Sequence, residues 1–198
     1  MLNLKYLDLA NNKFTEFPAF KCPKLEYLDV SQNKLEKINE GWAGHPSIKV
    51  LKGIDCKFKT MAPFKAMPKL AELYLSNNNI QTLNGYEGLP ALKKLHMRHN
   101  KIENIDEELP PMESLVYMNL RTNKLSKDED IPRLFTAFPT LVDLNVINCP
   151  IELNASSMDL MIGKMLVKNH NLKRFCKVEI TDELRLKSVY LSNYAHNE

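Results

Sequence analysis

The sequence predicts an α/β solenoid: a horseshoe of about eight coils with a parallel concave sheet and a helical cap at the C-terminal end. Two observations support this fold class. A motif of eleven residues recurs along most of the chain, at intervals close to 22 residues. After residue 151 the motif gives way to segments with the apolar spacing of helices.

The repeated motif has apolar residues at positions 1, 4, 6 and 11, and Asn or Cys at position 9. Its copies start at Leu4, Leu25, Ile48, Leu70, Leu92, Leu115 and Leu141, and a half-length copy starts at Leu172. Successive starts are 21, 23, 22, 22, 23, 26 and 31 residues apart. This pattern is that of leucine-rich repeats, in which each copy forms one coil of a horseshoe.

Each coil is expected to contain one short parallel strand, with its leucines pointing inward and the alternate residues facing out. The residue at position 9 should turn the chain after the strand and hydrogen-bond backbone groups of neighbouring coils. This column contains Asn12, Asn33, Cys56, Asn78, Asn100, Asn123 and Cys149. We interpret its two cysteines as turn residues, not as nucleophiles or ligands. Gly53, at an inward position, predicts a thinner core in the third coil.

The segments that return to the next strand mostly contain Pro just before it, as in FKCPKL and AMPKL. With about 22 residues per coil, we expect a short 3₁₀ helix or a single helical turn on the convex side of each coil. The sixth return, KDEDIPRLFTAF, is longer. Its apolar residues Ile131, Leu134, Phe135 and Phe138 have helical spacing and predict a helix.

The C-terminal part predicts two helices. We assign residues 1–176 to the solenoid, including a capping helix near 155–168, and 177–198 to a C-terminal helical extension. The capping helix has Asn154 or Ser156 as its expected N-cap. Its apolar stripe favours capping of the core, and the alternative is a groove for a partner; the stripe comprises Met158, Met161, Ile162, Met165 and Leu166. The second helix, roughly 182–192, should start at Thr181-Asp182-Glu183 with an N-cap and acids in its first turn, and it need not pack on the solenoid.

The N-terminal end shows no matching cap, because Leu4 opens a repeat almost at once. We therefore expect an exposed strand edge there, left either by a longer parent chain or for a covering partner.

Outward strand positions predict a protein-binding concave face. Asp8 and Asp29 make its start acidic, whereas Lys94, Arg98 and Arg121 with His96 make its middle basic, which favours an acidic protein partner. A solvated face is the alternative, and for each tyrosine so is packing between strands. The predicted binding residues are Tyr6, Asp8, Tyr27, Asp29, Lys52, Tyr74, Lys94, His96, Arg98, Tyr117 and Arg121.

Catalysis and cofactor binding have no support in the sequence. It contains no phosphate-binding loop, no nucleophile elbow and no rigidly spaced pair of carboxylates, so we predict a protein that is not an enzyme and holds no cofactor. A metal site at His96 and His99 lacks a third ligand, with Asn119 the one conceivable candidate. A phosphate or RNA site has only a short basic stretch to support it.

The composition points to a reducing compartment. Net charge is +3, the four cysteines are scattered, and no secretory signal or apolar run of membrane-spanning length is recognisable.

The chain resembles intracellular leucine-rich-repeat proteins of the 22-residue class. The segments LYLSNNNIQTLNGYEGLPALKKLHMRHNKIENI, LVYMNLRTNKL and LKRFCKVEIT, which cover about residues 70–180, are similar to the leucine-rich-repeat proteins of ciliary radial spokes. The resemblance implies a structural protein of the axoneme of the cilium or flagellum, within the cytoplasm. Its partners would be other axonemal or radial-spoke proteins in a large hetero-complex, with no small-molecule substrate, nucleic acid or membrane. A regulatory subunit of protein phosphatase 1 and a nuclear RNA-processing adaptor are the alternatives.

Overall fold

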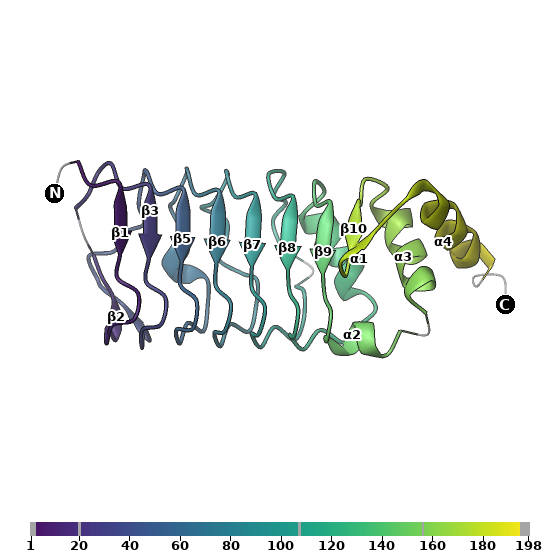
Figure 1. The fold of residues 1–198 in the computed structure, drawn as a ribbon, viewed down its shortest axis with the longest axis horizontal. Coiled ribbons are helices and arrows are strands. Elements are labelled where there is room, and N and C mark those ends of the chain that lie inside the picture. Colours follow the sequence, from purple (N-terminus) through teal and green to yellow (C-terminus); the bar gives the residue numbers. More distant parts are fainter. Residues whose placement is uncertain (1–2, 20, 107, 156, 195–198) are drawn as a thin grey trace.

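The computed structural model describes residues 3–19, 21–106, 108–155 and 157–194. They form an elongated solenoid in which one sheet runs along the whole stack of coils (Figure 1). In the described part of this sheet eight strands pair in parallel, and β11 (Val178–Glu179) adds an antiparallel pairing at the end. The parallel strands are β1 (Tyr6–Asp8), β3 (Tyr27–Asp29), β5 (Val50–Lys52), β6 (Glu72–Tyr74), β7 (Lys94–His96), β8 (Tyr117–Asn119), β9 (Asp143–Asn145) and β10 (Arg174–Phe175). The predicted solenoid and the register of its repeats are confirmed.

The core lies behind the sheet, where the inward residues of successive coils stack on one another. Leu28, Leu51, Leu73 and Leu95 occupy the same position in consecutive strands, and each is at most 1% exposed. A residue of one coil therefore contacts the equivalent residues on both sides, which explains why the apolar pattern is repeated so strictly.

The position-9 column forms the predicted hydrogen-bond ladder. Asn33 Nδ2 donates to the carbonyl oxygen of Leu9 in the preceding coil at 2.9 Å, and its Oδ1 accepts from the Phe14 N–H. Asn78, Asn100 and Asn123 repeat this arrangement.

The two cysteines of the column also act as predicted. Their thiols reach carbonyl oxygens of the preceding coil, Cys56 at 3.4 Å and Cys149 at 3.3 Å. Burial raises the pKa of each thiol to about 11, so both remain protonated donors at neutral pH.

The residue before each of these turn residues has a left-handed backbone, which the sequence analysis did not anticipate. These residues, here called the left-handed column, are Asn11, Gln32, Asp55, Asn77, His99, Thr122 and Asn148, with φ between 55° and 59°. Asn, Asp and His adopt this conformation more readily than other residues with side chains. His99 is therefore accounted for by the backbone of its turn.

The expected helical turn in each return is wrong for most coils. Among the described residues the first six returns contain one 3₁₀ helix, η1 (Ala62–Phe64), and one α-helix, α1 (Asp130–Ala137). The first two returns instead pair as β2 (Glu16–Phe17) and β4 (Lys37–Ile38). An extended chain covers about 3.3 Å per residue, against roughly 2 Å for a 3₁₀ helix, so a short return spans the coil only when it is extended.

The longer sixth return has room for a helix, and α1 confirms that prediction. Its residues Ile131, Leu134 and Phe135 are buried, as is Phe138 directly after it. Asp130 is fully buried at its start and accepts the Ile105 N–H at 3.0 Å, which ties the helix to the preceding coil.

The predicted thin core at Gly53 is wrong, because an aromatic side chain from the same coil fills the space. A Cβ atom placed on Gly53 would lie 2.8 Å from Cε2 of Phe58. Phe58 is 4% exposed and packs edge-on against Phe64 of η1, with ring centroids 5.1 Å apart. The glycine thus makes room for a larger neighbour.

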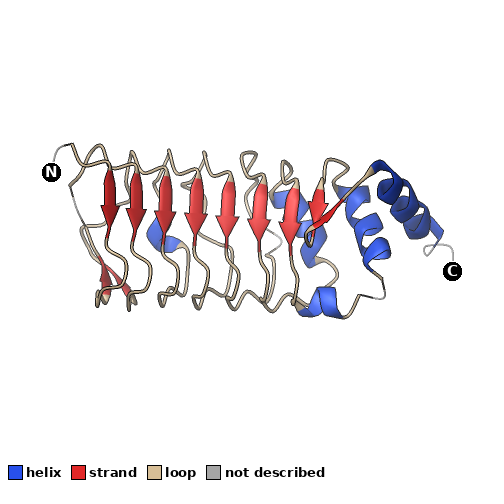
Figure 2. Cartoon of the chain, in the orientation of Figure 1, coloured by secondary structure: helices blue, strands red, loops and turns tan. Residues whose placement is uncertain are grey.

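The helical cap follows α2 (Pro150–Leu153), and the α-helices gather at the C-terminal end of the sheet, apart from the 3₁₀ helix η1 in the third coil (Figure 2). In α3 (Met158–Lys168) the residues Met161, Ile162, Met165 and Leu166 are buried, which confirms its capping role. Its N-cap is Ser157, whose Oγ accepts the Leu160 N–H at 3.1 Å. The expected cap Asn154 instead follows the end of α2, and Ser156 lies outside the described residues.

The last helix, α4 (Asp182–Tyr194), packs against α3. Lys187 Nζ lies 2.6 Å from a carboxylate oxygen of Asp159 on α3, and Arg185 donates to the carbonyl oxygens of His170 and Leu172. Thr181 Oγ1 accepts the Leu184 N–H at 3.2 Å, which confirms the predicted start of this helix. The second helix is therefore held to the cap.

At the other end, β1 is the edge of the sheet and pairs with β3 alone among the described strands. The predicted exposed edge is confirmed, and Tyr6 on it is 56% exposed. None of the helices that the structure describes has the length and apolar character needed to cross a membrane.

Candidate functional site

The candidate site is the outward side of the sheet, here called the strand face, which is the side expected to be concave. Successive side chains of a strand alternate between the core and this face, so the strand register arranges the outward residues in columns. Nine of the eleven predicted binding residues lie on strands at outward positions. The other two, Arg98 and Arg121, follow β7 and β8 by two residues.

Six of these side chains form a continuous stack, here called the ring ladder: Tyr6, Tyr27, Lys52, Tyr74, His96 and Tyr117. Each comes from one of six successive coils. The rings of Tyr6 and Tyr27 stack at 4.2 Å between centroids with 5° between their planes. Lys52 Nζ lies 5.3 Å from the Tyr27 centroid and 5.7 Å from that of Tyr74, within the range of cation–π attraction.

The ladder continues through a histidine. The His96 ring stacks on Tyr74 at 4.4 Å with 11° between planes, and it contacts Tyr117 at 4.7 Å with a tilt of 38°. Lys52 and His96 thus join the four tyrosines, a link that the sequence pattern alone did not predict. Alignment of the two outward columns of neighbouring repeats would have indicated it, because each gap between tyrosines holds a side chain that can pack on a ring.

Hydrogen bonds hold three of the tyrosine hydroxyls. Tyr74 donates to Glu72 Oε2 at 2.6 Å, Tyr27 donates to Asp29 Oδ2 at 3.3 Å, and Tyr117 accepts from the Asn119 amide at 3.3 Å. Burial and the bond to Glu72 raise the pKa of Tyr74 to about 12, so its hydroxyl stays protonated. Stacking and hydrogen bonds together fix the rings before any partner arrives.

The middle of the face is less basic than its sequence suggests. Lys94 Nζ lies 2.9 Å from Glu72 Oε1, which compensates its charge. Burial lowers the pKa of His96, so the imidazole is neutral at pH 7. Of the four groups expected to be basic, Arg98 and Arg121 therefore carry the local positive charge.

The acidic start of the face is present in the structure. Asp8 and Asp29 pair in register on β1 and β3, and each accepts the N–H two residues later at 2.9 Å. The face is thus acidic at β1–β3, aromatic along the ladder and cationic beside β7–β8. Among the described residues, no group of three or more His, Cys, Asp or Glu side chains could hold a metal ion.

The repeat geometry now has a match among known families. A family described as leucine-rich repeats in two copies matches residues 2–43 and 68–111, which contain β1, β3, β6 and β7. Both matched segments are therefore similar to leucine-rich repeats, and the solenoid that contains them has the leucine-rich-repeat fold. Leucine-rich-repeat solenoids typically act as scaffolds for interactions between proteins.

Solved leucine-rich-repeat structures share this fold. The TLR13–ssRNA13 complex matches 70% of the chain at 30% identity with a TM-score of 0.61. A chain of the Drosophila melanogaster SNF/U2A′ complex matches 67% at 19% identity with a TM-score of 0.56. The APL1 leucine-rich-repeat domain matches 78% at 20% identity with a TM-score of 0.54. These matches cover 21%, 83% and 36% of the respective chains. No curated protein matches the chain significantly.

Proposed function

We propose that the strand face binds a partner protein through the ring ladder. The single observation that supports this most strongly is the fixed stack from Tyr6 to Tyr117. Tyrosine is enriched at protein interfaces because it combines a large contact area with a polar tip. Rings already held by their neighbours lose little side-chain freedom on binding, which favours affinity.

The charges of the face define a complementary partner. Arg98 and Arg121 beside β7 and β8 favour carboxylates, whereas Asp8 and Asp29 at the other end favour basic groups. A partner that runs along the coils would therefore be acidic near β7–β8 and basic near β1–β3.

Single-stranded RNA fits the ladder less well, although the TLR13–ssRNA13 complex is among the similar structures. Base recognition by aromatic side chains needs free ring faces on which bases can stack. Here the faces of Tyr27, Tyr74 and His96 are covered by their ladder neighbours. The ring edges remain, and edges favour contacts with protein side chains.

The proposed setting is the axoneme of a cilium or flagellum, where the chain would be a non-catalytic structural part of a radial spoke. The support is the resemblance of residues 70–180 to radial-spoke leucine-rich-repeat proteins. Other axonemal proteins would be its partners. A phosphatase-1 regulatory subunit is less well supported, because such subunits carry acids and aromatics along the entire face, whereas here Arg98 and Arg121 interrupt them.

Purification of the tagged protein from ciliated and from non-ciliated cells tests this setting. We expect mass spectrometry to find radial-spoke and axonemal proteins with the bait from ciliated cells, in a salt-resistant axonemal fraction. Recovery of phosphatase-1 catalytic subunit or of spliceosomal proteins would replace the axonemal assignment. Confinement of the protein to the detergent-soluble fraction would also contradict it.

A further inference from the structure

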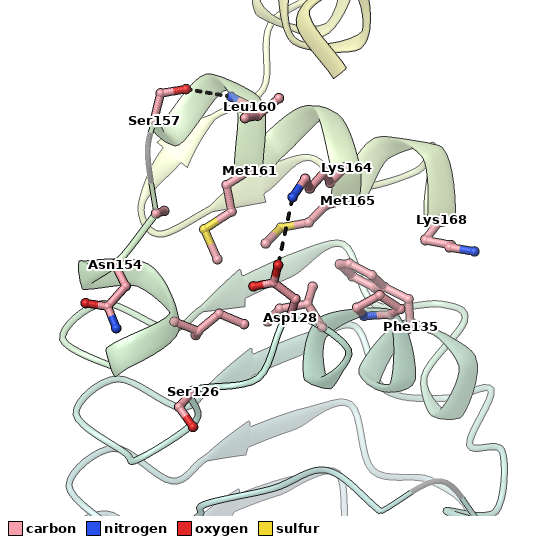
Figure 3. A pocket seen from close by; sticks show the side chains of 14 residues that line it. Ser126, Asp128, Phe135, Asn154, Ser157, Leu160, Met161, Lys164, Met165 and Lys168 are labelled. Atoms are coloured by element: carbon pink, nitrogen blue, oxygen red, sulfur yellow. Dashed lines mark hydrogen bonds and ion pairs between the residues drawn. The ribbon is translucent and has the colours of Figure 1, made fainter. Parts of the chain in front are cut away.

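A second candidate site lies away from the ring ladder, between the sixth return and the cap. A crevice of about 270 Å³ opens between α1, α2 and α3 (Figure 3). We call it the cap crevice and define its floor by Ile131, Phe135, Ile151, Met161 and Met165. No contact of the strand face involves these residues, so the crevice is separate from the site described above.

The floor of the crevice is apolar. Met161 and Met165 project from α3 into the crevice, and Phe135 lies on its other side (Figure 3). All five floor residues are at most 9% exposed, and the crevice volume of about 270 Å³ suits a small group. Methionine side chains are flexible and polarizable, and they adapt to an inserted chain better than branched residues do.

The mouth of the crevice carries more positive than negative charge. Lys164 and Lys168 lie one turn apart on α3 at its rim, opposite the single carboxylate of Asp128. Lys164 Nζ is 3.9 Å from Asp128 Oδ2, a long contact between side chains that are 54% and 89% exposed. Such an exposed pair contributes little, so Lys164 can exchange Asp128 for another carboxylate.

We propose that the cap crevice binds a medium-chain carboxylate. The alkyl tail would lie on the methionine floor between α1 and α3, and the carboxylate would pair with Lys164 at the mouth. A peptide backbone suits the floor less well, because the apolar side chains there offer no partner for its N–H and C=O groups. The volume is slightly below the range typical of drug-sized ligands, which also favours a single chain over a ring system.

Titration of the whole protein with decanoate, followed by NMR of the methionine methyl groups, tests the proposal. We expect the Met161 and Met165 methyl signals to shift below the micelle concentration, with a dissociation constant under about 1 mM. Signals of Met67 and Met97, buried in the third and fifth coils, should not move. From hexanoate to decanoate, affinity should rise roughly four-fold per methylene until the crevice is filled.

Two variants separate the roles of head group and tail. Lys164→Gln should weaken decanoate about three- to five-fold and leave the uncharged decanol unaffected; Lys34→Gln, at an exposed lysine of the second coil, is the matched control. Leu160→Trp, at a partly exposed residue lining the crevice, should block both ligands.

Three results would overturn the proposal. The first is the absence of methyl shifts with decanoate in a protein whose circular dichroism is native. The second is equal binding of decanol and decanoate, because the lysines would then have no role. The third is a shift of the same methyl groups by N-acetyl-leucyl-glutamate amide and not by decanoate, which would assign the crevice to a side chain of a protein partner.

Discussion

At the scale of single residues, Thr122 is the poorest fit in the left-handed column. Its φ is 56°, although a β-branched side chain disfavours that conformation, and its Oγ1 is buried with no hydrogen-bond partner among the described residues. We expect Thr122→Asn to raise the free energy of unfolding by about 0.5–1 kcal/mol, since asparagine tolerates this backbone. Urea denaturation measures the change.

The control for this prediction is the reverse substitution in the same column. Asn77 has a φ of 58°, so Asn77→Thr should destabilise the protein by a similar amount. If Thr122→Asn instead lowers the denaturation midpoint, the left-handed backbone is not what limits stability at this position.

Some side-chain contacts in the core were predictable from the sequence and others were not. The position-9 ladder was predictable because one residue type recurs at one register, and its cysteines could be assigned from the column alone. The packing of the core at Gly53 was not predictable, because Phe58, whose side chain fills the space, follows the strand and its turn. A pattern of apolar positions does not indicate which of two large residues points toward a gap.

At the scale of elements, His96 joins three strands and makes their packing sensitive to pH. Burial lowers its pKa below the usual value of 6.5, so the folded protein binds fewer protons than the unfolded chain in acid. Its contribution to stability is complete above pH 6.5 and is lost as the pH falls from there through the lower folded-state pKa.

Replacement by a ring that stays neutral over the pH range of the measurement isolates this effect. Between about pH 7.5 and about pH 5, the wild type should lose more unfolding free energy than His96→Tyr, measured by urea denaturation at each pH. Burial also lowers the pKa of His45. This histidine is present in both proteins, so its effect on the unfolding free energy cancels in the comparison. Parallel pH profiles for the two proteins would show that His96 is solvated in the folded state.

Secondary-structure elements were predicted correctly where the length of a return allowed only one conformation. The sixth return was recognised as helical because its apolar spacing is clear, and α1 follows. The prediction of a helical turn in the shorter returns was wrong. Their prolines and turn residues are compatible with an extended chain as well as with a 3₁₀ turn, and the width of the coil determines which conformation forms. The packing of α4 on α3 depends on contacts such as Lys187 with Asp159, which no local pattern predicts.

At the scale of the whole molecule, the repeat fixes the solenoid and also the layout of its surface. Once the strands are in register, residues 22 or so positions apart in the chain become neighbours about 4.8 Å apart. The eleven candidate residues could therefore be placed from sequence. Their mutual contacts could not, because the ion pair of Lys94 with Glu72 and the stacking of His96 depend on side-chain conformation.

The central claim is that the ring ladder is the docking surface for a partner protein. The most direct measurement is the recovery of axonemal proteins with three tagged forms: the wild type, Tyr74→Ala with Tyr117→Ala, and Lys59→Ala with Lys65→Ala on the third return as the control. We expect the tyrosine variant to lose partner recovery by about ten-fold or more, and the control to match the wild type. Unchanged recovery with the folded tyrosine variant would contradict the account and place the docking surface elsewhere on the solenoid.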